Sequence, residues 1–400
     1  MRKPELLVPA SSLEVLKIAT VFGADAVYIG GEAFGLRAKA RNFSKEEMAQ
    51  GIAFAHEHGV KVYVTVNILA HNYDLAGVRE YLKELKELKP DALIIADPGI
   101  FTYAKEICPQ ANNTNYETYR FWYKLGAKRV VTARELSLEE IRQIRANIPD
   151  DMEIETFIHG AMCISYSGRC LLSNFLVGRD ANQGSCTHPC RWKYSIVEES
   201  RPGEYMPVYE NERGTYIFNS KDLCMIEHMD DILTSGIDSL KIEGRMKTAL
   251  YVATVARTYR KAIDDYLEDP AKYQANMSWY QEQIAGCTYR KFTTGFFYGK
   301  PSEEAQIYDN NTYEKGYTYL GFAEAVDERG YVQITQRNKF TVGEMIEIMK
   351  PDGTNLLVPV KAIYDEEGNS VESAPHPQQK LFVDLGGEAE VYDILRRSEA

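Results

Sequence analysis

Residues 6–31, LLVPASSLEVLKIATVFGADAVYIGG, contain one complete strand–helix–strand unit. The apolar runs at 6–8 and 26–29 are typical of strands that are buried on both faces of a sheet. The stretch between them, at about 12–22, has the spacing of an amphipathic helix. The unit therefore predicts parallel strands that are covered by helices.

The same alternation continues to about residue 267. Further strands are expected at 61–68, 92–96, 129–132, 152–158 and 239–243. Further helices are expected from about residue 44 and at 75–88, 99–107, 115–125, 137–147 and 248–267. Seven clear strands with their helices favour a TIM-like (β/α)8 barrel over an open sheet. No G-x-G-x-x-G motif follows the first strand to indicate a dinucleotide-binding fold.

One unit of this barrel is shortened. Only residues 108–114 separate the helices expected at 99–107 and 115–125. This segment is too short for a loop, a strand and a second loop. We therefore expect the fifth strand to be reduced or missing.

The pattern changes near residue 300. Short alternating segments separated by glycine turns predict a small all-β domain there, most simply a β-barrel. A chain of 400 residues also exceeds the usual size of a single core. We therefore predict a catalytic barrel at 1–268 with a cysteine-rich insertion at 159–220, a linker at 269–305 and a C-terminal domain at 306–400.

The composition bears on the subcellular location of the protein and on its binding partners. The net charge of −12 disfavours a large non-specific nucleic-acid surface, although a local basic patch remains compatible with it. No run of 18 apolar residues predicts a membrane span, and the N-terminus has no secretory pattern. A cytoplasmic location is expected, in which cysteines remain thiols or bind metal rather than forming a disulfide framework.

The clearest chemical signal is a set of four cysteines in the insertion, spaced C-x6-C-x15-C-x3-C: Cys163, Cys170, Cys186 and Cys190. Thiolates suit zinc or an iron–sulfur cluster, and buried structural thiols are the plain alternative. Structural zinc prefers paired short spacings, which only the last two cysteines have, so the spacing favours a cluster. The loop follows strand 152–158, which predicts a metal at the catalytic face of the barrel.

Two candidate catalytic residues lie on that strand or directly after it. His159 could act as an acid, a base or a ligand, or simply cap a turn. Glu155, Phe157 and His159 alternate, so we expect them to share one face of the strand. A carboxylate such as Glu155 would be costly inside a barrel unless it were paired.

Charged residues at other strand ends complete the candidate site. Arg134 and Arg245 could hold an anionic substrate group through bidentate contacts. The alternative is a structural ion pair with Glu135 or with Glu243, which is itself a catalytic candidate. All four residues lie at the ends of predicted strands and should face the same end of the barrel.

Basic and aromatic residues near the cysteines and on the last helix could contact RNA. The basic residues are Arg169, Arg179, Arg191, Lys193, Arg257, Arg260 and Lys261. The aromatic residues, which could stack on unpaired bases, are Tyr166, Phe175, Trp192 and Tyr194. The alternative is that they are solvated charges and ordinary core rings.

Several motifs together resemble those of one family. Residues 155–170, ETFIHGAMCISYSGRC, look like the defining motif of the collagenase-like peptidase family U32. The segments ELLVPA at 5–10, DAVYIGG at 25–31, ARELS at 133–137 and LKIEGRMK at 240–247 are also similar. The resemblance covers almost the whole chain. It departs from the family at residues 108–112, where the usual end of the fifth strand is absent.

The resemblance carries functional expectations of its own. It implies that Cys163, Cys170, Cys186 and Cys190 hold a 4Fe-4S cluster on a barrel catalytic domain. The branch with the most similar architecture hydroxylates the wobble uridine of tRNA to 5-hydroxyuridine and requires prephenate, while a sister branch hydroxylates a cytidine of ribosomal RNA. The expected partners are therefore tRNA, an anionic metabolite such as prephenate, and a paralogous protein, with no membrane.

Two alternatives remain open at this point. A metal-dependent protease is suggested by the family name, but no nucleophile motif or metal-water motif of a protease is visible. A non-catalytic RNA-binding factor with structural zinc would also explain the cysteines. The iron–sulfur tRNA uridine hydroxylase is the leading hypothesis.

Overall fold

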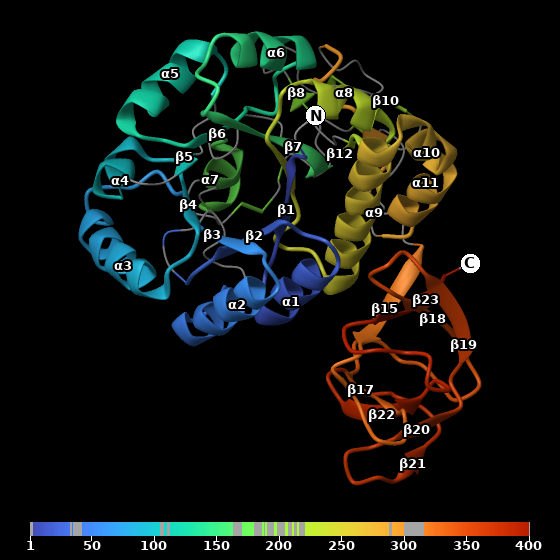
Figure 1. The fold of residues 1–400 in the computed structure, drawn as a ribbon. Coiled ribbons are helices and arrows are strands. Elements are labelled where there is room, and N and C mark those ends of the chain that lie inside the picture. Colours follow the sequence, from blue (N-terminus) through green and yellow to red (C-terminus); the bar gives the residue numbers. More distant parts are fainter. Residues whose placement is uncertain are drawn as a thin grey trace.

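The computed structural model shows a helix-ringed barrel and a separate β domain beside it (Figure 1). The structure describes residues 3–32, 34, 42–104, 108–109, 113–162, 170–179, 186–187, 189, 196–197, 205–206, 210–211, 214–215, 221–287, 290–299 and 316–399. None of the helices in these ranges combines the length and the apolar character that crossing a bilayer requires.

Within these ranges, eight parallel strands close into a barrel, which confirms the predicted fold class. In chain order the strands are β1 Glu5–Pro9, β2 Ala26–Gly30, β3 Lys61–Val66, β4 Ala92–Ile95, β5 Cys108–Pro109, β6 Arg129–Val131, β7 Glu153–Ala161 and β13 Ser239–Ile242. Each strand pairs with the next one in this order except β5 with β6, and β13 closes the ring on β1. The apolar runs around Leu6 and Val27 are fully buried, as expected for strands covered on both faces.

The fifth strand is reduced rather than missing. The two residues of β5 pair with Ile94 and Ile95 of β4. The ring then continues through a single parallel bridge between Asn113 and Thr132, just beyond the end of β6. The shortened segment in the sequence thus leaves the barrel closed.

An outer ring of helices covers the barrel. These helices are α1 Leu13–Val21, α2 Lys45–Glu57, α3 Leu75–Leu88, α4 Pro98–Tyr103, α5 Tyr116–Leu125, α6 Leu138–Ala146, α8 Met229–Thr234 and α9 Ala249–Glu268. Helices α2 and α6 begin with the capping boxes Ser44/Glu47 and Ser137/Glu140, which satisfy free N–H groups of the first turn. Helix α5 ends at Gly126, whose φ of 101° is readily adopted only by glycine.

The insertion lies between β7 and β13. It includes the short helix α7 Leu172–Val177, the strand pairs β8 Ile196–Val197 with β9 Tyr205–Met206 and β10 Glu210–Asn211 with β11 Gly214–Thr215, and strand β12 Asp222–Cys224. Because β7 extends to Ala161, His159 and Gly160 belong to this strand and not to the insertion, where the sequence analysis placed them. Strand β12 returns antiparallel to the end of β7 and pairs with β14 Phe292–Thr293.

The segment predicted as a linker contains two helices, α10 Pro270–Ala275 and α11 Met277–Ala285, which pack against α9. The C-terminal domain is all-β, as expected, and its strands form two antiparallel sheets around a second hydrophobic core. One sheet contains β15 Tyr317–Phe322, β23 Ile394–Ser398, β18 Met345–Met349 and β19 Asn355–Pro359. The other contains β16 Ala325–Val326, β17 Val332–Thr335, β22 Lys380–Asp384, β20 Ala362–Tyr364 and β21 Ser370–Val371.

Candidate active site

A group of charged, polar and aromatic side chains lies at the carboxyl ends of the barrel strands. We call it the mouth cluster: Arg134, Glu243, Arg245, Thr65 and Phe157. Arg134 follows β6, and its Nη2 lies 3.3 Å from Oε2 of Glu243, which follows β13. Arg134 Nη1 donates to the carbonyl of Ala161 at 2.6 Å, and the guanidinium lies 4.0 Å from the ring centroid of Phe157. The structure thus brings two predicted site residues together from separate strands.

Arg245 extends from the end of β13 to strands β2 and β3. Its Nη1 donates to Thr65 Oγ1 at 2.7 Å, and this hydroxyl donates to the carbonyl of Ile29 at 3.0 Å. The guanidinium packs so closely on Gly30 that a Cβ atom there would lie 2.6 Å from Nη1. Glycine at position 30 therefore makes room for Arg245.

Arg134 retains one donor that could serve a ligand. Its Nε is buried and donates to no group in the described structure. A buried N–H without an acceptor costs about 1–3 kcal/mol, which an entering anion would recover. Sequence reasoning left open an anion site or an ion pair with Glu243. The ion pair is present and still leaves the Nε donor for a ligand.

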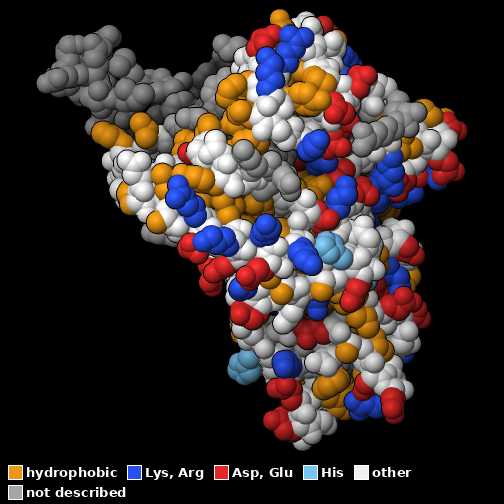
Figure 2. Space-filling view, turned by 60° about the vertical axis from the view of Figure 1, so that its left-hand side comes forward, with side chains coloured by type: hydrophobic (Ala, Val, Ile, Leu, Met, Phe, Trp, Pro, Cys, Tyr) orange, Lys and Arg blue, Asp and Glu red, His pale blue; other side chains and the backbone are white. Residues whose placement is uncertain are grey.

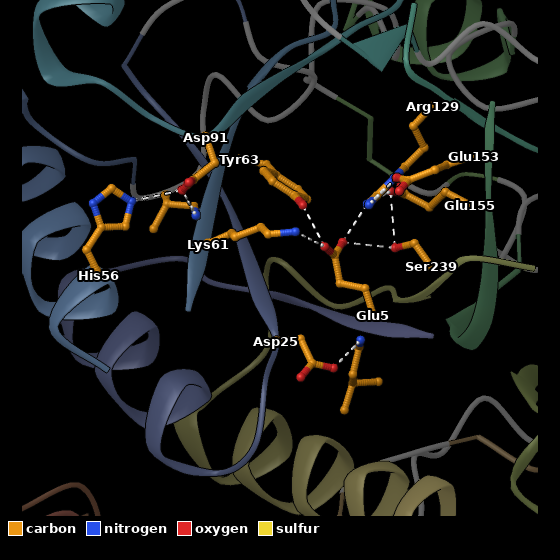
Figure 3. Close-up of polar contacts among 12 residues, drawn as sticks. Glu5, Asp25, His56, Lys61, Tyr63, Asp91, Arg129, Glu153, Glu155 and Ser239 are labelled. Carbon is orange, nitrogen blue, oxygen red and sulfur yellow. Dashed lines mark hydrogen bonds and ion pairs between the residues drawn. The ribbon is translucent and has the colours of Figure 1, made fainter. Parts of the chain in front are cut away.

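Glu155 lies in a different place, among residues at the amino-terminal ends of the strands. It accepts hydrogen bonds from Lys241 Nζ at 2.8 Å and from Arg129 Nη1 at 3.2 Å. Figure 3 shows Arg129 between Glu5, Glu153 and Glu155. The buried Glu155 carboxylate is thus paired, as the sequence argument required. Residues at this end of a TIM barrel usually stabilise the fold, whereas catalytic residues lie at the other end.

His159 faces away from the barrel interior, which corrects the expectation that it shares a face with Glu155 and Phe157. Strand β7 pairs regularly with β13 up to Phe157, but the next pair is His159 with Ile242, so Ile158 is an extra residue. A bulge of this kind shifts the alternation and turns the following side chain to the other face. His159 consequently contacts helix α9.

The environment of His159 is aromatic and closed to solvent. Its Nδ1 lies 3.3 Å from the hydroxyl of Tyr259, and the rings of Tyr251 and Phe292 are centred 6.0 and 5.8 Å away. Burial lowers the pKa of His159 to about 4, against the opposing effect of Asp222. The imidazole is therefore neutral at physiological pH, and because it faces helix α9 rather than the barrel interior it suits positioning rather than proton transfer.

Two predicted metal ligands, Cys170 and Cys186, lie in the described part of the chain, whereas Cys163 and Cys190 fall outside it. Helix α7 begins two residues after Cys170, and Ser173 in its first turn accepts a hydrogen bond from the backbone N–H of Thr187 at 3.1 Å. This contact ties the segment of Cys186 to that of Cys170. Taken alone, the described residues hold no group of three side chains arranged for a metal.

The basic residues of the last helix do not form the expected RNA patch. Arg257 is buried and donates to Gln283 at 2.6 Å and to the Lys350 carbonyl at 2.7 Å, so it joins α9 to α11 and to the C-terminal domain. Arg260 pairs with Asp25, which precedes β2, and with Asp264 of α9, and Lys261 pairs with Asp265 of α9. Six other candidates lie outside the described residues: Tyr166, Arg169, Arg191, Trp192, Lys193 and Tyr194. Phe175 and Arg179 are described and exposed.

Sequence reasoning missed several residues of the mouth. Thr65 receives Arg245, Tyr28 donates to the Ile242 carbonyl at 2.9 Å, and Tyr251 donates to the Glu243 carbonyl at 3.0 Å. Tyr28 and Thr65 occupy alternate positions of apolar strands, where period-two spacing could have placed them inside the barrel. No sequence signal distinguishes them from ordinary core residues.

Comparison with known proteins supplies the wider context. Residues 11–307 match peptidase family U32, and residues 315–396 match the peptidase family U32 C-terminal domain. The tRNA hydroxylation protein P1 of Bacillus subtilis is 42% identical over 407 residues, which cover 100% of this chain and 96% of that protein. The tRNA hydroxylation protein P of Escherichia coli is 37% identical, with coverage of 100% and 97%. A 23S rRNA 5-hydroxycytidine synthase of Escherichia coli is 36% identical, with coverage of 66% and 40%.

Proposed function

Since this chain belongs to peptidase family U32, and full-length relatives are named for tRNA hydroxylation, we propose that it is an enzyme that hydroxylates tRNA. The observation that carries the proposal is the sequence identity to the tRNA hydroxylation proteins, which extends along the whole chain and includes the C-terminal domain. A relative named for cytidine hydroxylation in ribosomal RNA supports RNA bases as the class of substrate. The position we propose is the wobble uridine, converted to 5-hydroxyuridine in the cytoplasm.

The mouth cluster is the proposed site of the chemistry. Arg134 offers a buried Nε donor, and Arg245 is held by Thr65 and Gly30 close to the carboxyl ends of β2 and β3. Two guanidinium groups suit an anionic co-substrate, for which prephenate is the candidate. Glu243 orients Arg134, whereas we assign Glu155 to barrel stability and His159 to positioning of the β7 bulge.

A 4Fe-4S cluster is the cofactor that we propose for the four cysteines, with zinc as the alternative. The hydrogen bond between Thr187 and Ser173 supports the fit, because it draws the segments of Cys170 and Cys186 together beyond the end of β7. Such a cluster would supply electron transfer or an open iron site next to the mouth. Anaerobic purification with iron and sulfide analysis separates the alternatives, since one equivalent of zinc without visible absorbance would overturn the cluster.

The function is tested by measuring 5-hydroxyuridine in tRNA from a strain that lacks this gene. Wild-type protein should restore the nucleoside and Cys170→Ser should not. Cys287→Ser, which changes a buried cysteine outside the set of four, should restore it. Unchanged 5-hydroxyuridine on deletion would contradict the proposal, and cleavage of gelatin by the pure protein, abolished by a chelator, would favour the protease instead.

A further inference from the structure

Exposed apolar side chains concentrate at the catalytic end of the barrel. The three most exposed large apolar side chains among the described residues are Phe175, Tyr73 and Leu171, at 84%, 76% and 73%. All three follow the carboxyl ends of strands, Tyr73 after β3 and the other two after β7. On the face seen in Figure 2, hydrophobic side chains gather over part of the barrel domain, with charged side chains of both signs around them. Exposed apolar groups of this kind mark interaction sites.

Tyr73 belongs to a loop whose shape is fixed by hydrogen bonds. His71 N–H donates to the Asp74 carboxylate at 2.8 Å, and Ala70 N–H donates to the Asp97 carboxylate at 3.2 Å. Asp97 is also the N-cap of α4, so the loop is anchored to the next unit of the barrel. The ring of Tyr73 is therefore held at the rim by a built loop and not by contacts of its own with the core.

The ring of Tyr73 already has one stacking partner. His71 lies parallel to it, with the ring centroids 5.3 Å apart and the planes 4° from parallel. The side chain of Asn72, which lies between these two residues in the sequence, is exposed and polar. The loop thus presents a short aromatic stack beside an exposed polar side chain.

We propose that Tyr73, backed by His71, is a stacking platform for an unpaired base of the RNA substrate. The inference rests on the proposed function, because it assigns to the same mouth a residue that recognises the RNA strand. Proteins bind unpaired bases by stacking them on exposed aromatic rings, and one ring face is sufficient for one base. Stacking also needs no net positive charge, which agrees with the acidic chain.

The test uses the purified full-length protein and a tRNA anticodon stem-loop that carries 2-aminopurine at one loop position at a time. Stacking on Tyr73 should quench the fluorescence at one or two positions. Tyr73→Ala should remove this quenching and weaken binding about 5- to 150-fold, whereas Tyr73→Trp should retain both. The slope of log Kd against log salt concentration should remain that of the wild type, because stacking releases no counterions.

Phe121→Ala is the matched control, since Phe121 is a half-exposed aromatic residue on α5, away from the strand ends. It should bind like the wild type. Wild-type affinity and quenching in Tyr73→Ala would overturn the inference, and a simultaneous change in oligomeric state would assign the loop to a protein partner instead. If deletion leaves tRNA hydroxylation unchanged while Tyr73 still quenches the loop, the proposed function fails and the platform stands.

Discussion

His159 illustrates how burial determines the behaviour of a single residue. Its pKa in the folded protein is lowered from 6.5 to about 4 by desolvation. The unfolded chain therefore binds a proton between these pH values that the folded protein does not bind, and folding stability is lost as the pH falls from 6.5 towards 4.

We predict that His159→Phe flattens this part of the stability profile. The wild type should lose up to about 1.4 kcal/mol per pH unit through this group between pH 6.5 and 4. Urea unfolding at several pH values measures the difference between the two proteins. Parallel profiles would show that His159 titrates normally in the folded protein.

Substitution of Glu155 tests the buried ion network that this residue forms with Lys241 and Arg129. We predict that Glu155→Gln lowers the free energy of unfolding by about 3–5 kcal/mol, because it leaves the buried Lys241 ammonium without its carboxylate. The double variant Glu155→Gln/Lys241→Met should recover part of the loss. As a control, Glu80→Gln removes an exposed ion pair with Lys83 and should change stability by less than about 1 kcal/mol. Equal effects of Glu155→Gln and Glu80→Gln would rule out a stabilising role for the network.

Sequence reasoning predicted the pairing of Glu155 correctly, because the cost of burying an unpaired charge is general. A carboxylate inside a barrel needs a partner, and Glu155 has two, Lys241 and Arg129. The side on which His159 lies was not predictable, because alternation assumes a regular strand. The extra residue at Ile158 is set by contacts with segments far away in the sequence.

At the scale of elements, Tyr259 of α9 holds the β7 bulge in place. Its hydroxyl donates to the Ile158 carbonyl at 3.2 Å and accepts from Met225 N–H at 3.1 Å. It thereby links the helix, the bulge and the segment that follows β12.

We predict that Tyr259→Phe costs about 1 kcal/mol and speeds hydrogen exchange at the Met225 amide. Tyr273→Phe is the matched control, since Tyr273 bridges Met229 N–H and the Ile226 carbonyl in the same manner. In Tyr273→Phe, hydrogen exchange should become faster at the Met229 amide and stay unchanged at the Met225 amide. Identical exchange patterns in the two variants would contradict a specific role for Tyr259.

The reduced fifth strand makes Asn113 important for barrel closure. Its buried side chain accepts from Trp122 Nε1 at 3.0 Å and donates to the Val131 carbonyl at 3.4 Å. We predict that Asn113→Ala lowers the free energy of unfolding by about 1–3 kcal/mol and increases hydrogen exchange in β6. Wild-type exchange in β6 would show that the Asn113 side chain does not hold the seam next to the bridge with Thr132.

Most elements of the barrel could be predicted because their signals are local. The apolar strands, the helix at 75–88 and both capping boxes follow from the sequence alone. Strand β12 and the two residues of β5 were not recognised, because they are defined by pairing with distant strands. Short segments of this kind have too little periodicity to identify.

At the scale of the whole molecule, the two domains share polar contacts. Glu14 of α1 accepts hydrogen bonds from Tyr319 and Arg337 of the C-terminal domain, and Arg257 of α9 donates to the Lys350 carbonyl. The alternating pattern beyond residue 300 predicted the second domain but not these contacts. Arg257, expected to contact RNA, instead joins the domains, since a charge count does not reveal which arginines are already paired.

The central claim is that the mouth cluster of this chain carries out tRNA hydroxylation, and Arg134 is its most direct test. The measurement is the amount of 5-hydroxyuridine in tRNA from the deletion strain, complemented with Arg134→Gln or with Arg142→Gln, which alters an exposed arginine on α6. Protein levels are matched by immunoblotting. The account predicts a loss of 5-hydroxyuridine of about tenfold or more with Arg134→Gln, and wild-type modification with Arg142→Gln. Full modification with Arg134→Gln would contradict it.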